Sequence, residues 1–143
     1  MIYISHRGFI NGKDTKLENN PDQINYLLEQ NINVEIDVRF YKNKFYLGHD
    51  EPSYEIDKKF LNNSKLWCHA KNYETLNVLT KIDCHYFWHQ EDDYTLTSKG
   101  VLWVYPGKKL TKNSICVLPE LSDYKIFDCL GICSDFIKRY KND

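Results

Sequence analysis

Residues 33–41 read NVEIDVRFY, a run in which apolar and polar side chains alternate. β-Branched and aromatic residues that alternate with a period of two are typical of a β-strand. A second apolar run, FYLG at residues 45–48, follows after Lys42-Asn43-Lys44. We therefore predict a β-hairpin with these three residues as its loop.

The length of this loop sets the register of the hairpin. If Tyr41 pairs with Phe45, then Asp37 lies opposite His49. Glu35 lies on the same face as Asp37, because side chains repeat every two residues along a strand. A shift of one residue would destroy this match, so the register is a specific prediction.

Short apolar runs on both sides of the hairpin predict further strands. Pro21, followed by apolar residues at helical spacing, predicts a helix over residues 21–30. Asn72 begins a second helix, and Phe136-Ile137 belong to a third. With the two hairpin strands we expect eight strands, at residues 2–5, 33–41, 45–48, 65–69, 84–88, 101–104, 114–117 and 130–133.

The alternation of strands and helices predicts the fold class. Strands separated by helices pair in parallel, and eight such strands form a TIM-type barrel. These barrels usually need about 200 residues or more, whereas this chain has 143. We therefore predict an α/β fold in which residues 1–143 form a single domain, a minimal, contracted TIM-type (β/α) barrel with few or shortened helices.

Composition argues against several functional classes. The net charge of −1 gives no general attraction to nucleic acid. No apolar stretch approaches the roughly 20 residues that span a bilayer, and the N-terminal sequence does not resemble a signal peptide. Five cysteines, mostly inside apolar runs, are typical of buried thiols in a reducing compartment. We expect a cytoplasmic protein with no transmembrane segment and no nucleic-acid partner; its oligomeric state is left open.

Glu35 and Asp37 are the first candidates for chemistry. On an antiparallel strand such a pair usually forms a polar edge facing solvent. Inside a parallel barrel, two like charges need a cation, and oxygen ligands suit hard ions such as Mg²⁺ and Ca²⁺. His69 ends another predicted strand, where it can complete the metal ligand set.

Two histidines and two further cations also follow predicted strands, where active-site loops begin in α/β folds. His6 and His49 can divide general acid and base catalysis on a phosphodiester. Arg7, one of three arginines beside sixteen lysines, suits bidentate binding of phosphate, and Lys71 suits its neutralisation. A surface salt bridge is the alternative for Arg7, and ordinary packing or exposure is the alternative for the histidines.

These residues occur in motifs that resemble the glycerophosphodiester phosphodiesterase family, within the PI-phospholipase-C-like TIM-barrel group. The match is strongest over residues 3–51 and becomes thinner beyond them. His69 stands where the family usually has a glutamate. The matching motifs are His6-Arg7-Gly8, Glu18-Asn19, Glu35-x-Asp37, His49-Asp50, the lysine of His69-x-Lys71, and Gly131-Ile132-Cys133-Ser134-Asp135.

The resemblance implies a PI-PLC-like phosphodiesterase fold. It also implies a metal-dependent hydrolase whose partner is a small-molecule substrate, a glycerophosphodiester or a similar small alkyl or lipid-derived phosphodiester. One divalent cation is implied, with Mg²⁺ or Ca²⁺ expected; a histidine at position 69 also admits Mn²⁺ or Zn²⁺. The implied catalytic, phosphate-binding and metal-binding residues are, in that order, His6 and His49; Arg7 and Lys71; and Glu35, Asp37 and His69.

Two other functions fit the same residues. One is a transferase or lyase, similar to the phospholipase-D-type toxins of this superfamily, that leaves a cyclic phosphate. The other is a non-catalytic barrel that binds a phosphorylated ligand or serves as a scaffold. Product analysis separates the first from hydrolysis. The second predicts the loss of some of the six polar groups of the proposed site, whereas this chain keeps them. The chain is short for the family and has little room for the insertion that encloses the glycerol end, so the leaving alcohol stays open.

Overall fold

The computed structural model describes residues 1–122 and 128–141. All eight predicted strands are present, and the structure adds two more, β4 and β7. The elements are β1 (Ile2–His6), α1 (Pro21–Glu29), β2 (Asn33–Tyr41), β3 (Lys44–Leu47), β4 (Tyr54–Ile56), η1 (Lys58–Asn62), β5 (Leu66–Ala70), α2 (Tyr73–Leu79), β6 (Tyr86–Phe87), β7 (Tyr94–Leu96), β8 (Leu102–Val104), β9 (Ser114–Val117), η2 (Pro119–Leu121), β10 (Gly131–Ser134) and α3 (Ile137–Tyr140).

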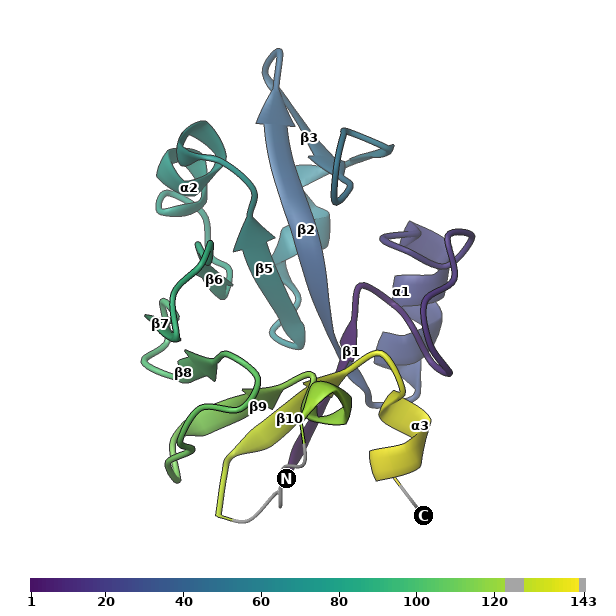
Figure 1. The fold of residues 1–143 in the computed structure, drawn as a ribbon. Coiled ribbons are helices and arrows are strands. Elements are labelled where there is room, and N and C mark those ends of the chain that lie inside the picture. The colour runs from purple at the N-terminus through teal and green to yellow at the C-terminus, as the bar shows by residue number, and fades with distance from the viewer. Residues whose placement is uncertain (123–127, 142–143) are drawn as a thin grey trace.

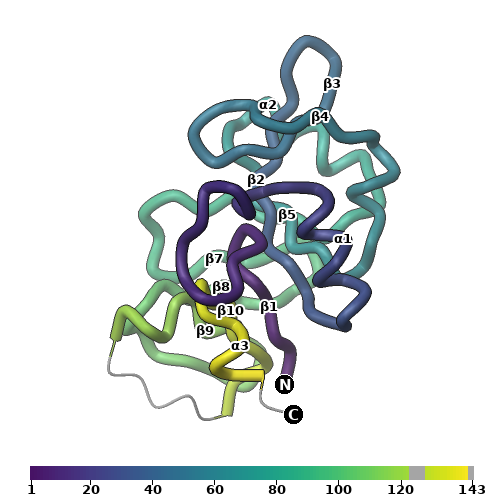
Figure 2. The backbone as a smooth tube through the Cα atoms, turned by 90° about the vertical axis from the view of Figure 1, so that its right-hand side faces the viewer, coloured from purple at the N-terminus to yellow at the C-terminus, as the bar shows by residue number. Residues whose placement is uncertain are grey.

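The strands form one curled, mixed sheet (Figure 1). Strand β1 lies between β2 and β10 and runs parallel to both. On one side β5 and β6 continue the parallel pairing, and on the other side β9 and β8 do so. Strands β3, β4 and β7 are antiparallel additions. The C-terminal helix α3 lies beside β1 (Figure 2).

The predicted minimal TIM-type (β/α) barrel is wrong. The sheet is a half-barrel, and within residues 1–122 and 128–141 no ladder joins β6 to β8. The same ranges hold three short α-helices, far fewer than one for each strand. The β3–β4 hairpin occupies the place of a helix after β2, and residues 105–113 join β8 to β9 without a helix. The β8–β9 link is too short to hold a crossover helix, and the longer β2–β5 connection holds a hairpin instead, so the outer helical layer is largely missing.

The predicted hairpin register is also wrong, by one residue. Tyr41 pairs with Lys44, so the loop is the dipeptide Lys42-Asn43. Both loop residues have positive φ, 48° and 64°, which is the backbone of the type I′ turn that two-residue hairpins favour. Asp37 consequently lies opposite Gly48, whose N–H donates to the Asp37 carbonyl at 3.0 Å.

Glu35 and Asp37 lie on the inner face of the curled sheet. Trp67 pairs in register with Glu35 and therefore shares its face. The Trp67 ring reaches the ring of Trp103 on β8 at a centroid distance of 5.8 Å, although four strands separate β5 from β8 in the sheet. The inner face is apolar toward the strand starts, and its polar side chains gather toward the carboxyl ends of β1, β2 and β5.

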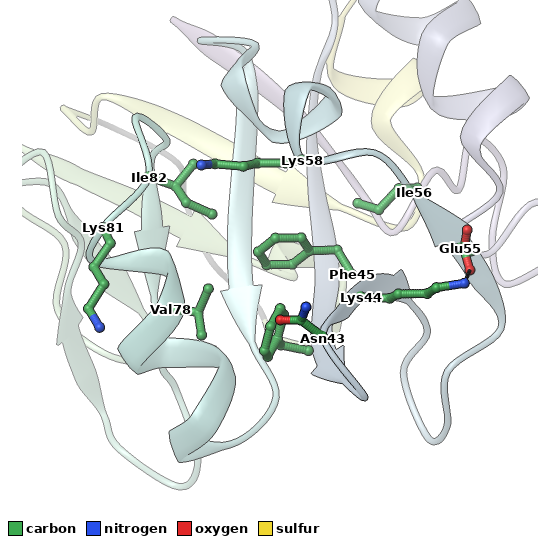
Figure 3. Close-up of a pocket in the computed structure, with 10 residues that line it drawn as sticks. Asn43, Lys44, Phe45, Glu55, Ile56, Lys58, Val78, Lys81 and Ile82 are labelled. Atoms are coloured by element: carbon green, nitrogen blue, oxygen red, sulfur yellow. Dashed lines mark ion pairs between the residues drawn. The ribbon is translucent and has the colours of Figure 1, made fainter.

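The outer face has a groove of about 490 Å³ between α2 and the β3–β4 hairpin (Figure 3). Its floor is mainly apolar, with Phe45, Ile56 and Val78 directed into it. Lys44 and Glu55 at the rim pair with each other at 3.2 Å. The groove contains none of the predicted site residues. No helix in the described ranges has the length and apolar character needed to cross a membrane.

Candidate functional site

Three potential metal ligands converge at the polar end of the inner face. Glu35, Asp37 and His69 each offer a ligand atom, and these atoms lie within 4.8 Å of one another. The pairing of β2 with β5 explains the convergence, because Asp37 and His69 are direct neighbours in the parallel register. Both carboxylates are buried, with Glu35 2% and Asp37 0% exposed. Buried like charges need compensation, and the surrounding side chains supply part of it.

The two oxygens of Asp37 have different surroundings. Oδ2 accepts a hydrogen bond from the Asn19 amide at 2.9 Å, and it lies 3.2 Å from Arg7 Nε and 3.5 Å from His49 Nδ1. Oδ1 lies 3.4 Å from His69 Nδ1 and 3.7 Å from Lys71 Nζ. No residue in the described ranges makes a hydrogen bond of good geometry to Oδ1, so this oxygen is the one available to a ligand.

Burial and neighbouring charges move the pKa values of the two carboxyl groups apart. Burial alone would raise the pKa of Asp37, but the neighbouring imidazoles of His49 and His69 and the charges of Arg7 and Lys71 hold it well below its usual range. Burial, with the adjacent Asp37 charge, raises the pKa of Glu35 well above its usual range. Asp37 is therefore the firm anion of the pair, and a cation is needed to hold Glu35 ionised.

His6 lies between two carboxyl groups. Its Nδ1 is 2.5 Å from Asp135 Oδ1, and its Nε2 is 4.0 Å from Glu35 Oε2. Asp135 is itself held, because its backbone N–H donates to Glu120 Oε1 at 2.9 Å. Strand pairing brings these groups together: β1 lies between β2, which carries Glu35, and β10, which ends just before Asp135.

Two tight turns place the residues that follow β1 and β3. Arg7 and Gly8 both have positive φ, 55° and 94°, and a Cβ at position 8 would meet the Leu17 carbonyl at 3.0 Å. After β3, a Cβ at Gly48 would lie 1.8 Å from the Glu51 carbonyl. Glycine is required at both positions, and the turns direct Arg7 and His49 toward Asp37.

A cavity of about 370 Å³ opens beside the acidic pair. Of the predicted site residues, four line it: Arg7, His49, His69 and Lys71. Glu35 and Asp37 are buried next to these side chains, whereas His6 reaches the cluster through Glu35. His49 lies near Asp37 although the register differs from the predicted one. The strand ladder ends at Leu47, and the following turn directs the His49 imidazole toward the Asp37 carboxylate. The other lining residues are Ala70, Trp88, His89 and Gln90.

The three candidate ligands fit a divalent cation. Glu35 Oε1 and Asp37 Oδ1 are buried, and neither has a hydrogen-bond partner in the described part of the chain. A buried carboxylate oxygen without a partner is costly unless a cation or water occupies the space before it. Two carboxylates with one imidazole form an ordinary ligand set for such an ion.

Sequence reasoning missed three supporting residues. Asn19 and Asp135 lie in motifs of the family resemblance, but no role was assigned to them. Glu120, which holds Asp135 and also accepts from Ser134 Oγ at 2.9 Å, lies in no such motif. The available signal was the place of the two residues in these motifs, since Asn19 follows Glu18 and Asp135 ends the motif at residues 131–135. Glu120 carried no signal at all.

Comparison with known proteins adds no identification. No protein-family model, no curated protein and no solved structure matches this chain.

Proposed function

We propose that this protein is a metal-dependent phosphodiester hydrolase, related to the glycerophosphodiester phosphodiesterase family. Its substrates are glycerophosphodiesters or similar small alkyl or lipid-derived phosphodiesters. The observation that carries the proposal is the convergence of Arg7, Lys71 and His49 on Asp37 at one cavity. Two fixed cations, an imidazole and a buried acidic pair are the groups needed to bind a phosphodiester and move its protons.

The cations bind and orient the phosphate. Arg7 and Lys71 approach Asp37 from two sides, at 3.2 Å from Oδ2 and 3.7 Å from Oδ1. Both also line the cavity, so they can turn their remaining N–H groups toward non-bridging oxygens. A divalent cation held by Glu35, Asp37 and His69 would add Lewis-acid polarisation of the phosphoryl group.

The two histidines take different parts in proton transfer. Asp135 only accepts, so neutral His6 carries its proton on Nδ1 and presents a lone pair at Nε2. We assign His6 as the base that takes the proton of the attacking water as its oxygen bonds to phosphorus. The bond from phosphorus to the alcohol oxygen then breaks, and His49, next to Lys71 at 3.5 Å, gives its proton to the leaving alkoxide.

The proposal includes a cytoplasmic location and no nucleic-acid partner. All five cysteines are free, and four of them are buried. This state suits a reducing compartment. The net charge of −1 supplies no general attraction to nucleic acid.

Phosphorus NMR on a panel of substrates tests the proposal. The full chain is incubated with a divalent cation and with glycerophosphodiesters and lysophospholipids that differ in the alcohol. Hydrolysis predicts a phosphate monoester as the product. A stable cyclic phosphate would instead identify a transferase or lyase, and no turnover on any member would favour a phosphate-binding protein.

A further inference from the structure

The imidazole of His69 is fixed in both orientation and tautomer. Its ring stacks on Phe87 with an interplanar angle of 8° and a centroid distance of 5.1 Å. Its Nε2 lies 2.9 Å from the backbone carbonyl oxygen of His89. Its Nδ1 faces Asp37 Oδ1 at 3.4 Å. The ring plane is therefore held at one edge by a backbone contact, and the other edge faces the acidic pair.

The carbonyl contact decides which nitrogen carries the proton. A carbonyl oxygen only accepts, so this contact requires the proton on Nε2. The His89 N–H is a competing donor to Nε2 at 3.4 Å, but the carbonyl contact is the shorter of the two, at 2.9 Å. In the neutral ring Nδ1 then holds the lone pair and faces Asp37 Oδ1. Metal-binding histidines typically donate their second N–H to a carbonyl or carboxylate in this way.

We propose that this site selects Zn²⁺ over Mg²⁺ and Ca²⁺ through the Nδ1 atom of His69. The inference rests on the proposed function, which requires a divalent cation but leaves its class open. The site differs from an all-carboxylate site because its third candidate ligand is the imidazole of His69. The geometry that carries it is the convergence of His69 with Glu35 and Asp37, with Nδ1 facing Asp37 Oδ1. Each carboxylate has one buried oxygen without a hydrogen-bond partner among the described residues.

Ligand chemistry and charge point the same way. Mg²⁺ and Ca²⁺ bind oxygen ligands and depend on negative charge, whereas imidazole nitrogen favours Zn²⁺ and its neighbours in the first transition row. With His69 as third ligand the site has at most two negative charges, and Arg7 and Lys71 lie close to one of them. Mg²⁺ and Ca²⁺ should therefore lose the most affinity at this site, because the low negative charge weakens their binding and the His69 nitrogen is a poor ligand for them.

Calorimetric titration of the full chain, stripped with EDTA and dialysed, tests this preference. Zn²⁺, Mg²⁺ and Ca²⁺ are each titrated into the wild type, His69→Glu and His89→Ala. Most sites bind Zn²⁺ more tightly than Mg²⁺, so the informative quantity is the change in the Zn²⁺/Mg²⁺ affinity ratio. We expect His69→Glu to lower this ratio by about 10–100-fold, the range in which ligand-shell changes act.

His89→Ala is the matched control. It removes an imidazole whose ring centre lies 6.3 Å from that of His69 but keeps the backbone carbonyl that holds Nε2. The ratio should stay within about twofold of the wild type, because the proposal makes no ligand of this side chain. An unchanged ratio in His69→Glu, or an equal fall in both variants, overturns the inference.

NMR of the histidine rings gives a second test that does not require the glutamate variant to fold. Long-range ¹H–¹⁵N correlation in the metal-free wild type should show His69 protonated at Nε2, with the assignment made by comparison with His69→Gln. Addition of Zn²⁺ should shift Nδ1 of this ring. An Nδ1–H tautomer, or an Nδ1 that Zn²⁺ leaves unshifted, contradicts the proposal.

The outcomes separate this inference from the proposed function. If Mg²⁺ binds the wild type more tightly than Zn²⁺ and hydrolysis depends on Mg²⁺, the preference is wrong and the hydrolase stands. If Zn²⁺ binds through His69 but no phosphodiester is cleaved, the metal preference stands and the hydrolase fails. If no divalent cation binds, both fail.

Discussion

Asn19 holds Asp37 by two hydrogen bonds, although 18 residues separate them. The Asn19 amide donates to Asp37 Oδ2 at 2.9 Å, and its side-chain carbonyl accepts the Asp37 backbone N–H at 3.0 Å. Asn19 is itself 1% exposed and has a φ of 53°. Asparagine tolerates this left-handed backbone better than most residues. The pair fixes which oxygen of Asp37 remains free for a ligand.

Asn19→Gly removes both side-chain hydrogen bonds to Asp37, and glycine adopts the left-handed backbone at low strain. We expect activity to fall by about 10–100-fold, the usual cost of losing a group that orients a metal ligand. Asn20→Gly is the control. It removes the N-cap of α1, and glycine at an N-cap costs only a few tenths of a kcal/mol. Equal activities in the two variants would contradict the role of Asn19.

Asp135 positions His6, and a double-mutant cycle tests this assignment. Asp135→Asn weakens the 2.5 Å contact to His6 Nδ1 and lets the ring turn or change tautomer. His6→Ala removes the base. Because both changes disable one unit, the double variant should be no slower than His6→Ala alone. If the two losses multiply, Asp135 acts independently of His6.

His49 is assigned as the acid, and the leaving group provides the test. His49→Ala should slow turnover of a glycerophosphodiester by about 10²–10⁴-fold, the usual contribution of general acid catalysis. A substrate with a p-nitrophenyl leaving group needs no proton, so most of this loss should disappear. His6→Ala should lose activity on both substrates. Equal losses of His49→Ala on both substrates would remove the acid role.

His85 makes the folded state sensitive to acid. Burial, with the charge of Lys99, lowers its pKa from 6.5 to about 4, and its Nε2 is 2.7 Å from Thr97 Oγ1. The unfolded chain then binds more protons between these two pH values, so the free energy of unfolding falls as pH drops through this window. At about 1.4 kcal/mol per pKa unit the loss is at most about 3.5 kcal/mol.

Urea unfolding of the wild type and His85→Gln from pH 7 to pH 4 measures this effect. Carboxyl groups titrate in both proteins, so the difference between their pH slopes isolates His85. The wild type should lose more stability than the variant as pH falls. Parallel slopes would contradict the depressed pKa of His85.

Much of the local structure could be predicted from the sequence. The sequence did not show that the sheet stays open as a half-barrel. Alternation in the hairpin and short apolar runs elsewhere predicted the eight expected strands, and Pro21 marked the helix that the structure has at Pro21–Glu29. The patterns do not reveal whether a strand is followed by a helix or by another strand. The β3–β4 hairpin and the short β8–β9 link therefore replaced expected barrel helices. The Lys42-Asn43 turn depended on two positive φ angles, which the sequence does not report.

The candidate site shows the same division. Glu35, Asp37 and His69 were predicted to converge, and parallel pairing of β2 with β5 brings them together. The supporting residues Asn19 and Glu120 were missed because they lie in irregular or short segments whose position depends on tertiary contacts. Asn19 lies in an irregular loop, and Glu120 reaches Asp135 from a short 3₁₀ turn.

Hydrolysis by wild type, Asp37→Asn and Asp83→Asn, with EDTA and after restoring a divalent cation, tests the central claim most directly. Asp37 is fully buried at the centre of the cluster, whereas Asp83 is exposed and does not line the adjacent cavity. We predict that EDTA abolishes turnover, that the cation restores it in wild type and Asp83→Asn, and that Asp37→Asn stays at least about 100-fold slower while remaining folded. Full-rate hydrolysis in EDTA, or a fully active Asp37→Asn, would contradict the account.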